Sequence, residues 1–365
     1  MTLKNCDVYQ LKDIIKNKKL VCFGMGKVLH DFVQDFLCME FEKDIFAIAD
    51  NKVEKETYIL FNKIFIKVIN PKQLIEIEDI VILISCADVA EILEQLNSYG
   101  LADTIDCYVV YFIRSLTNCK EEKDRKYPIT FKISEQQKIP KRIHYCWFGN
   151  KPLPEKNRGW MESWKKYCPD YEIVRWDENN YDFAKNRYMH EAFKEKKWAF
   201  VSDYARLDIV FNYGGIYLDT DVELVKSFDE LLYQDAFCGI EASKKINLGL
   251  GFGAKEGHPL FQEILNLYNN IHFVDKEGKQ NLTTCVQIQD AFYKKKGFLN
   301  NGNFQIIQDM SVYPELVFSP KDLYTGELNI TEYTFSIHHY DASWTDKKTK
   351  KRVNTIKELY RKLER

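Results

Sequence analysis

The chain has 365 residues, enough for two domains, and its 45% hydrophobic and 29% charged residues are typical of a folded globular protein. Its 52 Lys and Arg against 54 Asp and Glu give a net charge of −2, which excludes a broad electrostatic footprint for nucleic acid. No run of 18 apolar residues is present and the N-terminal sequence is highly charged, so neither a membrane-spanning helix nor a signal peptide is predicted. The ten cysteines lack C-x-x-C spacing, which indicates reduced, mostly buried thiols and a cytoplasmic location.

The first block of the chain, residues 1–115, alternates predicted strands with predicted helices. Strands are expected at 20–23, 45–49, 81–85 and 108–113, and helices at 27–39 and 88–98. This alternation predicts an α/β domain with a parallel sheet and crossover helices.

Two glycines open the first predicted helix directly after a strand, at Gly24 and Gly26. Such a turn can bind a nucleotide phosphate, and Asp50 at the end of the next strand can hold a ribose. The third glycine of the G-x-G-x-x-G pattern is replaced by Leu29. The alternative is purely structural: the glycines form a tight turn and Asp50 caps a loop.

The polar segment 116–138 is predicted to be a linker, followed by a second α/β block over 139–345. The tail, residues 346–365, is predicted to be a basic amphipathic helix. Its apolar residues recur at helical spacing: Val353, Ile356, Leu359, Tyr360 and Leu363. Two uses stay open, since this stripe can pack on a domain or place the protein peripherally on an anionic inner membrane surface.

The segment 200–224 is the most informative one for chemistry. Ser202 is predicted to cap a helix that stops at Gly214, and a strand is expected from Ile216 to Leu218. The two acids that follow the strand, Asp219 and Asp221, are two residues apart, so their carboxylates should point to one side.

Asp203 and Arg206 are three residues apart in the predicted helix and therefore share a face. Two carboxylates at a strand end, with an arginine nearby, suit Mn²⁺ or Mg²⁺ together with phosphates. The structural alternatives are a pair of turn acids, Asp219 and Asp221, and a surface ion pair on the helix.

Residues 200–224, FVSDYARLDIVFNYGGIYLDTDVEL, closely resemble the core of the D-x-D sugar transferases, glycosyltransferase family 32. The family includes yeast initiating mannosyltransferases and many bacterial capsule enzymes, and the stretch is more distantly similar to the catalytic domain of large clostridial glucosylating toxins. Further ordered matches to the family lie at 139–149, 163–164, 171–177, 253–259 and 338–344. The family's Gly-Pro pair before a later helix is replaced here by residues 281–285. The first block, over 18–115, resembles the Rossmann-like domain found before bacterial sugar transferases.

The resemblance implies a GT-A type nucleotide-sugar-binding domain that retains anomeric configuration. It implies that Asp221 ligates the metal directly and that Asp219 touches the metal shell and the donor ribose or sugar. Asp203 and Arg206 are expected to hold hydroxyls of the donor sugar.

The other residues predicted to contact the donor lie before, between and after these four in the sequence: His144, Trp147, Gly215, Tyr217, Asn247, His339, Ser343 and Trp344. His144 and Trp147 are expected beside the nucleotide. The structural alternative for each is an ordinary role in the core. The last three are expected to close over the diphosphate, with His339 as a third metal ligand.

These observations predict a metal-dependent glycosyltransferase that moves a hexose from a UDP- or GDP-sugar to a saccharide, free or lipid-linked, in capsular or surface polysaccharide synthesis. No nucleic acid partner is expected. Two alternatives stay open: an NAD-dependent enzyme that modifies nucleotide sugars through the first block, and a sugar-binding scaffold without turnover.

Overall fold

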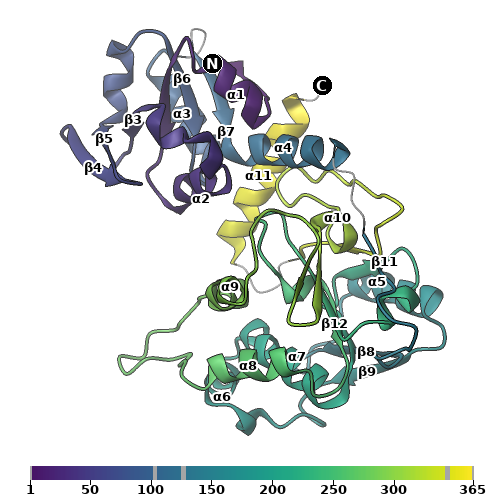
Figure 1. The fold of residues 1–365 in the computed structure, drawn as a ribbon. Coiled ribbons are helices and arrows are strands. Elements are labelled where there is room, and N and C mark those ends of the chain that lie inside the picture. Colours follow the sequence, from purple (N-terminus) through teal and green to yellow (C-terminus); the bar gives the residue numbers. More distant parts are fainter. Residues whose placement is uncertain (1, 102–104, 125–128, 342–345, 364–365) are drawn as a thin grey trace. The chain divides into compact units, whose positions relative to one another are not determined.

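The computed structural model describes residues 2–101, 105–124, 129–341 and 346–363 (Figure 1). The chain forms two compact units. Unit 1 combines Met1–Arg125, Asp322–Glu327 and Thr345–Arg365, and unit 2 combines Lys126–Lys321 and Leu328–Trp344. Among the described residues, no helix has the length and apolar character needed to cross a membrane.

Unit 1 is built on a seven-stranded sheet. In spatial order its strands are β1 (Thr2–Leu3), β7 (Asp106–Val109), β6 (Ile80–Ile84), β2 (Lys19–Phe23), β3 (Ile45–Ala49), β5 (Ile64–Ile69) and β4 (Thr57–Phe61). All neighbours pair in parallel except β4, which runs antiparallel to β5. The α/β class and the parallel sheet predicted for this block are confirmed.

Helices cover both faces of this sheet. They are α1 (Val8–Ile14), α2 (Lys27–Asp35), α3 (Val89–Ser98), α4 (Val110–Asp124) and α11 (Lys347–Leu363). Side chains of α1 and α2 join one buried cluster, and side chains of α3 and α11 join the cluster on the other side. The central strand β6 is buried along its whole length, as expected for a parallel strand covered on both faces.

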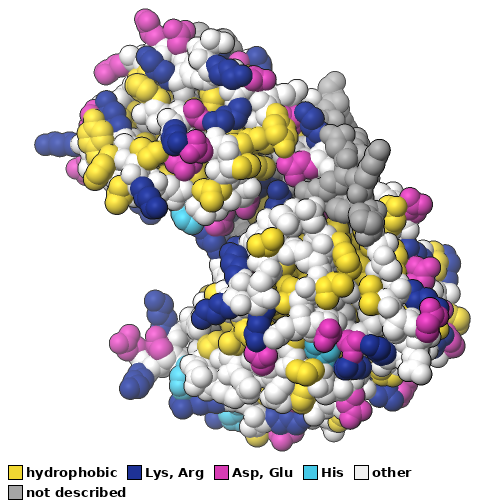
Figure 2. Space-filling view, viewed as in Figure 1, with side chains coloured by type: hydrophobic (Ala, Val, Ile, Leu, Met, Phe, Trp, Pro, Cys, Tyr) yellow, Lys and Arg dark blue, Asp and Glu magenta, His cyan; other side chains and the backbone are white. Residues whose placement is uncertain are grey.

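One strand predicted for this block had the wrong bounds. The strand predicted at 108–113 ends at Val109, where α4 begins, because a fully buried apolar run has no periodicity that separates strand from helix. Helix α4 then continues to Asp124, into the segment predicted as linker. The β4–β5 hairpin was not predicted. Its turn residues Asn62 and Lys63 both have positive φ, and lysine is rare at such positions, so the sequence gives little indication of the turn. Hydrophobic side chains are exposed on this hairpin (Figure 2).

The first glycine turn has the structural role that was one of the two alternatives. Gly24 has a φ of 102°, which favours glycine, and Asp50 accepts hydrogen bonds from the backbone N–H groups of Met25 (3.2 Å) and Lys52 (2.9 Å). Asp50 therefore caps a loop and fastens it to the glycine turn.

The C-terminal helix α11 completes unit 1. Ile356 and Tyr360 are buried, and Tyr360 donates a hydrogen bond to Glu327 (3.0 Å). Arg352 pairs with Asp88 at the start of α3. The apolar stripe of the tail thus packs on the domain, the first of its two predicted uses.

Unit 2 contains a second seven-stranded sheet, which is mixed. Its strands in spatial order are β14 (Gln305–Ile307), β15 (Met310–Tyr313), β12 (Ala236–Gly239), β13 (Phe252–Ala254), β10 (Gly215–Tyr217), β8 (Arg142–Cys146) and β9 (Glu172–Trp176). The three strands β10, β8 and β9 are parallel, whereas β13 runs antiparallel to β10 and to β12. A separate two-stranded ribbon pairs β11 (Val222–Leu224) with β16 (Ser336–His338).

The helices of unit 2 are α5 (Glu155–Tyr167), α6 (Arg187–Lys194), α7 (Trp198–Tyr213), α8 (Pro259–Tyr268), α9 (Cys285–Lys295) and α10 (Glu315–Phe318). Side chains of α6, α7 and α8 share one buried cluster, while those of α5 and α10 belong to the other. The predicted α/β class is confirmed here as well, and β10 delivers the chain to the acidic pair.

Candidate active site

Helix α7 is buried along most of its length and carries the first two site residues. It begins at Trp198, so the prediction that Ser202 is its N-cap was wrong; Ser202 donates to the Ala199 carbonyl instead (2.8 Å). The apolar residues before Ser202 continue the helix into the core. At the other end, Gly214 stops the helix as predicted, with a φ of 60°.

Asp203 and Arg206 form a buried ion pair on this helix. Arg206 Nη2 donates to Asp203 Oδ1 at 2.6 Å, and the two side chains are only 6% and 9% exposed. A surface ion pair, the structural alternative, is therefore wrong. Burial raises the pKa of the Asp203 carboxyl, and the neighbouring guanidinium opposes that rise.

Strand β10 places Asp219 against the same arginine. Arg206 Nη1 lies 3.6 Å from Asp219 Oδ2, and the Tyr217 hydroxyl donates to Asp219 Oδ1 at 3.0 Å. Arg206 thus lies between two carboxylates from different elements. Burial raises the pKa of Asp219 and Arg206 lowers it, while the charge of Asp221 raises it further.

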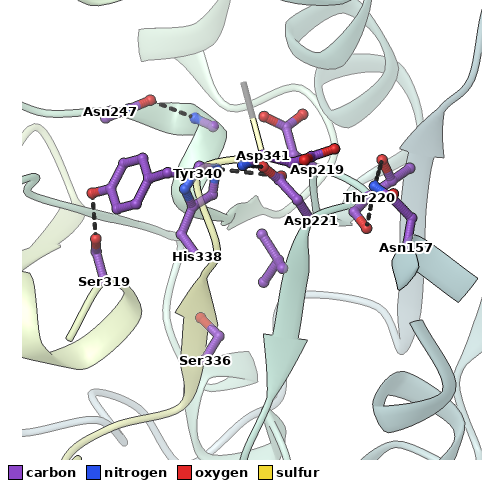
Figure 3. A network of polar contacts seen from close by, with 12 residues as sticks. Asn157, Asp219, Thr220, Asp221, Asn247, Ser319, Ser336, His338, Tyr340 and Asp341 are labelled. Atoms are coloured by element: carbon purple, nitrogen blue, oxygen red, sulfur yellow. Dashed lines mark hydrogen bonds and ion pairs between the residues drawn. The ribbon is translucent and has the colours of Figure 1, made fainter. Parts of the chain in front are cut away.

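Asp221 is held by the segment that follows β16 (Figure 3). One carboxylate oxygen accepts from the backbone N–H of Asp341 (2.9 Å), and the backbone carbonyl of Asp221 accepts from the N–H of His339 (2.9 Å). The other carboxylate oxygen lies 3.4 Å from Nε2 of His338. Strand pairing between β11 and β16 brings this histidine in, because Val222 is opposite His338.

Asp219, Asp221 and His338 form a candidate metal centre, with ligand atoms within 4.8 Å of one another. The two carboxylates converge as their spacing predicted. Two carboxylate oxygens and an imidazole nitrogen form a donor set that fits Mn²⁺, and the carboxylates alone fit Mg²⁺. The buried Nδ1 of His338 has no hydrogen-bond partner among the described atoms.

The histidine in this cluster is not the one predicted. His339 Nε2 donates to Glu223 (2.8 Å), and its Nδ1 accepts from Lys321 (3.2 Å). Its ring stacks on Trp160 with centroids 4.3 Å apart. Because successive residues of an extended chain point to opposite sides, only one of two adjacent histidines can face the carboxylates, and that one is His338.

A turn from Leu248 to Leu250 closes over the arginine and Asp219. A side-chain carbon added at Gly249 would lie 2.9 Å from Asp219 Oδ2 and 3.1 Å from Arg206 Nη1. Asn247 shapes this turn, since its Oδ1 accepts from the Gly249 N–H (2.8 Å) and its Nδ2 donates to Glu241 (2.7 Å). The Asn247 amide thus holds the backbone of this turn next to Arg206 and Asp219.

The two residues predicted beside the nucleotide differ in their surroundings. His144 is buried, its Nε2 donates to the Gly214 carbonyl (2.9 Å), and its Nδ1 accepts from Trp176 (3.1 Å). Burial lowers the pKa of His144 to about 4, so the ring is neutral. His144 is therefore a satisfied core histidine. Trp147 is partly exposed at the end of β8 and donates to the Lys151 carbonyl (2.6 Å).

Gly215 lies where β10 approaches β8. A side-chain carbon there would come within 2.8 Å of the Arg142 carbonyl, and the φ of 101° also favours glycine. The glycine is thus required for strand packing below the site. The predicted residues Ser343 and Trp344 lie outside the described residues.

The comparison with protein families matches the segment that holds the two motif acids. Residues 154–238 match the family model described as glycosyltransferase sugar-binding region containing DXD motif. These 85 residues therefore resemble the sugar-binding region of the DXD glycosyltransferases. This match includes both acids of the motif and the buried Asp203–Arg206 pair, and excludes His338.

Several known proteins resemble part of this chain. Inositol phosphoceramide mannosyltransferase 3 of Schizosaccharomyces pombe is 32% identical over 45% of this chain and 48% of its own length. Mannosyl phosphorylinositol ceramide synthase SUR1 of Saccharomyces cerevisiae is 32% identical over 47% of each chain. The chain thus spans about half the length of these relatives. A solved structure, PaToxG glycosyltransferase, aligns with a TM-score of 0.36 and 18% identity over 51% of this chain and 79% of that one.

Two residues that lie beside Asp203 or the motif acids were not predicted from the sequence. His338 was set aside because nothing local distinguishes it from its neighbour. Cys285, the first residue of α9, contacts Asp203, and burial raises the pKa of its thiol well above the usual range. The sequence feature that could have drawn attention to Cys285 is the departure of the segment 281–285 from the family pattern.

Proposed function

We propose that this DXD glycosyltransferase region belongs to a metal-dependent, retaining hexosyltransferase of GT-A type that uses a nucleoside diphosphate sugar. The observation that carries the proposal is the convergence of Asp219, Asp221 and His338 beside the buried Arg206. Three groups from two elements distant in sequence meet there, whereas an ordinary turn acid needs no such partners.

Asp219, Asp221 and His338 would hold a divalent cation, Mn²⁺ or Mg²⁺. A bound cation would supply charge stabilisation for the departing diphosphate. Binding would also relieve the repulsion between the two carboxylates, which raises the pKa of Asp219. The backbone contacts of Asp221 hold that carboxylate in place before any ligand arrives.

Arg206 and Asp203 supply the fixed charges of the donor site. Arg206 adds positive charge beside Asp219 and orients it, while Asp203 offers a carboxylate oxygen for a hydroxyl of the donor sugar. Because both side chains are buried on a rigid helix, their positions are set before the donor binds.

Retention of configuration requires either a covalent glycosyl-enzyme or attack on the face from which the diphosphate leaves. Asp203 is already engaged by Arg206 at 2.6 Å, and the other two carboxylates belong to the proposed metal site. This distribution favours same-face attack, with the diphosphate oxygen taking the proton of the acceptor hydroxyl. Trapping a glycosyl adduct on Asp203 would contradict it.

For the substrates, the relatives offer a guide. Inositol phosphoceramide mannosyltransferase 3 and SUR1 are both named for mannose and for inositol phosphoceramide lipids. We therefore favour a mannose donor and a lipid-linked acceptor here, in the synthesis of a capsular or surface glycan. With such an acceptor, we propose that the protein works in the cytoplasm, peripherally at the inner face of a membrane.

The test is thermal unfolding of the chain with UDP- and GDP-sugars, with and without Mn²⁺. A donor present at 100 times its Kd stabilises the folded state by about 2.7 kcal/mol. We expect one nucleotide class to stabilise the chain only with metal, and Asp221→Asn to abolish that effect. Asp170→Asn, an exposed acid of unit 2, serves as the control and should behave like the wild type. Equal shifts for Asp221→Asn and the wild type would rule the metal site out.

A further inference from the structure

Helix α11 concentrates positive charge on its surface. Its 17 residues include eight Lys and Arg and a single acid, Glu358. The basic residues are Lys347, Lys348, Lys350, Lys351, Arg352, Lys357, Arg361 and Lys362. The chain as a whole has a net charge of −2, so this excess is local.

The apolar side of the helix is already in use. Ile356 and Tyr360 are buried in the core of unit 1, and Leu359 and Leu363 pack against the same cluster. At about 100° per residue, Lys347, Lys351 and Lys362 lie on the opposite side of the helix together with the acid Glu358, and all four are exposed.

We propose that this solvent-facing basic side of α11, hereafter the basic face, binds anionic phospholipid headgroups without inserting into the bilayer. Attraction of lysines to a negatively charged leaflet supplies the binding. The buried stripe excludes the usual amphipathic mode, in which apolar residues enter the acyl region. The choice of a lipid surface rests on the proposed function, because a lipid-linked acceptor has to be met at a membrane.

The charge on the basic face is sufficient for reversible attachment. Each lysine near an anionic surface contributes about a fivefold increase in binding. Glu358 offsets one of the three lysines, so the net charge of this face accounts for about a 25-fold increase, and loss of all three lysines costs about a hundredfold. Such binding weakens steeply as salt shortens the range of the attraction.

The experiment is co-sedimentation of the full chain with vesicles. Vesicles of phosphatidylglycerol and phosphatidylcholine in equal amounts should bind it, and vesicles of phosphatidylcholine alone should not. Binding should vanish at about 1 M salt, where the screening length is about 3 Å. The triple variant Lys347→Gln, Lys351→Gln, Lys362→Gln should bind about a hundredfold more weakly.

A matched variant removes the same charge elsewhere on unit 1: Lys27→Gln, Lys55→Gln, Lys63→Gln, all exposed and outside α11. It should bind like the wild type, and equal loss in both triple variants would overturn the basic face. Binding that survives 1 M salt would mean insertion and would also overturn the proposal, as would tighter binding to an RNA oligonucleotide than to the vesicles. Asp221→Asn should bind vesicles normally, so failure of the proposed catalytic function remains distinguishable.

Discussion

Arg206 is the side chain on which the geometry of the site depends. It contacts a carboxylate of its own helix, Asp203, and one delivered by a strand, Asp219. Replacing Arg206 by an uncharged residue would leave two buried carboxylates without their counter-charge. Such a change lowers the free energy of unfolding far more than the loss of a surface ion pair does. Arg206 therefore stabilises the fold and also positions the two carboxylates.

His144 gives a prediction for the pH dependence of stability. Its pKa is about 4 in the folded chain against an ordinary 6.5, because burial disfavours the charged ring. A depressed pKa of a base means that the stabilisation is fully present above pH 6.5 and is lost as the pH falls toward 4. We expect this residue alone to cost about 3 kcal/mol of unfolding free energy between pH 7 and pH 4.

Urea unfolding at several pH values measures this effect. In His144→Gln the stability should fall less between pH 7 and pH 4 than in the wild type. His30→Gln, which changes an exposed histidine, should leave the wild-type profile intact. Parallel profiles for wild type and His144→Gln would show that the ring is not held neutral.

At the scale of elements, the turn over the site has little room. Gly249→Ala places a methyl group against Asp219 and Arg206, at 2.9 and 3.1 Å. Because real side-chain carbons do not approach so closely, either the turn or the carboxylate must move. We expect Mn²⁺ affinity to fall about tenfold or more, since a ligand displaced by about 1 Å loses much of its productive geometry.

Isothermal titration with Mn²⁺ checks the Gly249 prediction. Gly159→Ala is the matched control, because nothing lies within 4 Å of the added carbon and the residue is inside helix α5. That variant should bind metal as the wild type does and be slightly more stable. Unchanged affinity in Gly249→Ala would mean that the turn does not constrain the site.

Elements with a clear pattern were predicted well from the sequence. The strands expected at 20–23 and 45–49 agree with β2 and β3, because apolar runs bounded by turn residues are local signals. The helix stop at Gly214 and the convergence of the two motif acids are local as well. His338 could not be predicted, because its place depends on the pairing of β16 with β11, more than 100 residues earlier in the chain. The core role of His144 depended likewise on a distant partner, Trp176.

At the scale of the whole molecule, unit 1 depends on the last helix of the chain. Ile356 is 1% exposed and belongs to the same buried cluster as strands β2 and β6. Ile356→Ala should therefore destabilise unit 1 by about 2–5 kcal/mol, through lost burial and the cavity that remains.

Denaturant unfolding followed by hydrogen exchange locates this loss. Protection should fall in β2 and β6, whereas α7 and β10 of unit 2 should keep theirs. Thr355→Ala, the preceding residue, is partly exposed and should change stability by less than about 0.5 kcal/mol. Equal loss of protection in both units would mean that they unfold together.

The order of segments in unit 1 has a consequence for synthesis. Its sheet is translated first, but α11 follows all of unit 2. A ribosome therefore has to translate all of unit 2 before α11 can cover the earliest strands. A product that terminates before α11 would leave the apolar surface around β2 and β6 exposed to solvent, and quality-control proteases recognise such surfaces. The arrangement thereby links survival of the polypeptide to translation through α11.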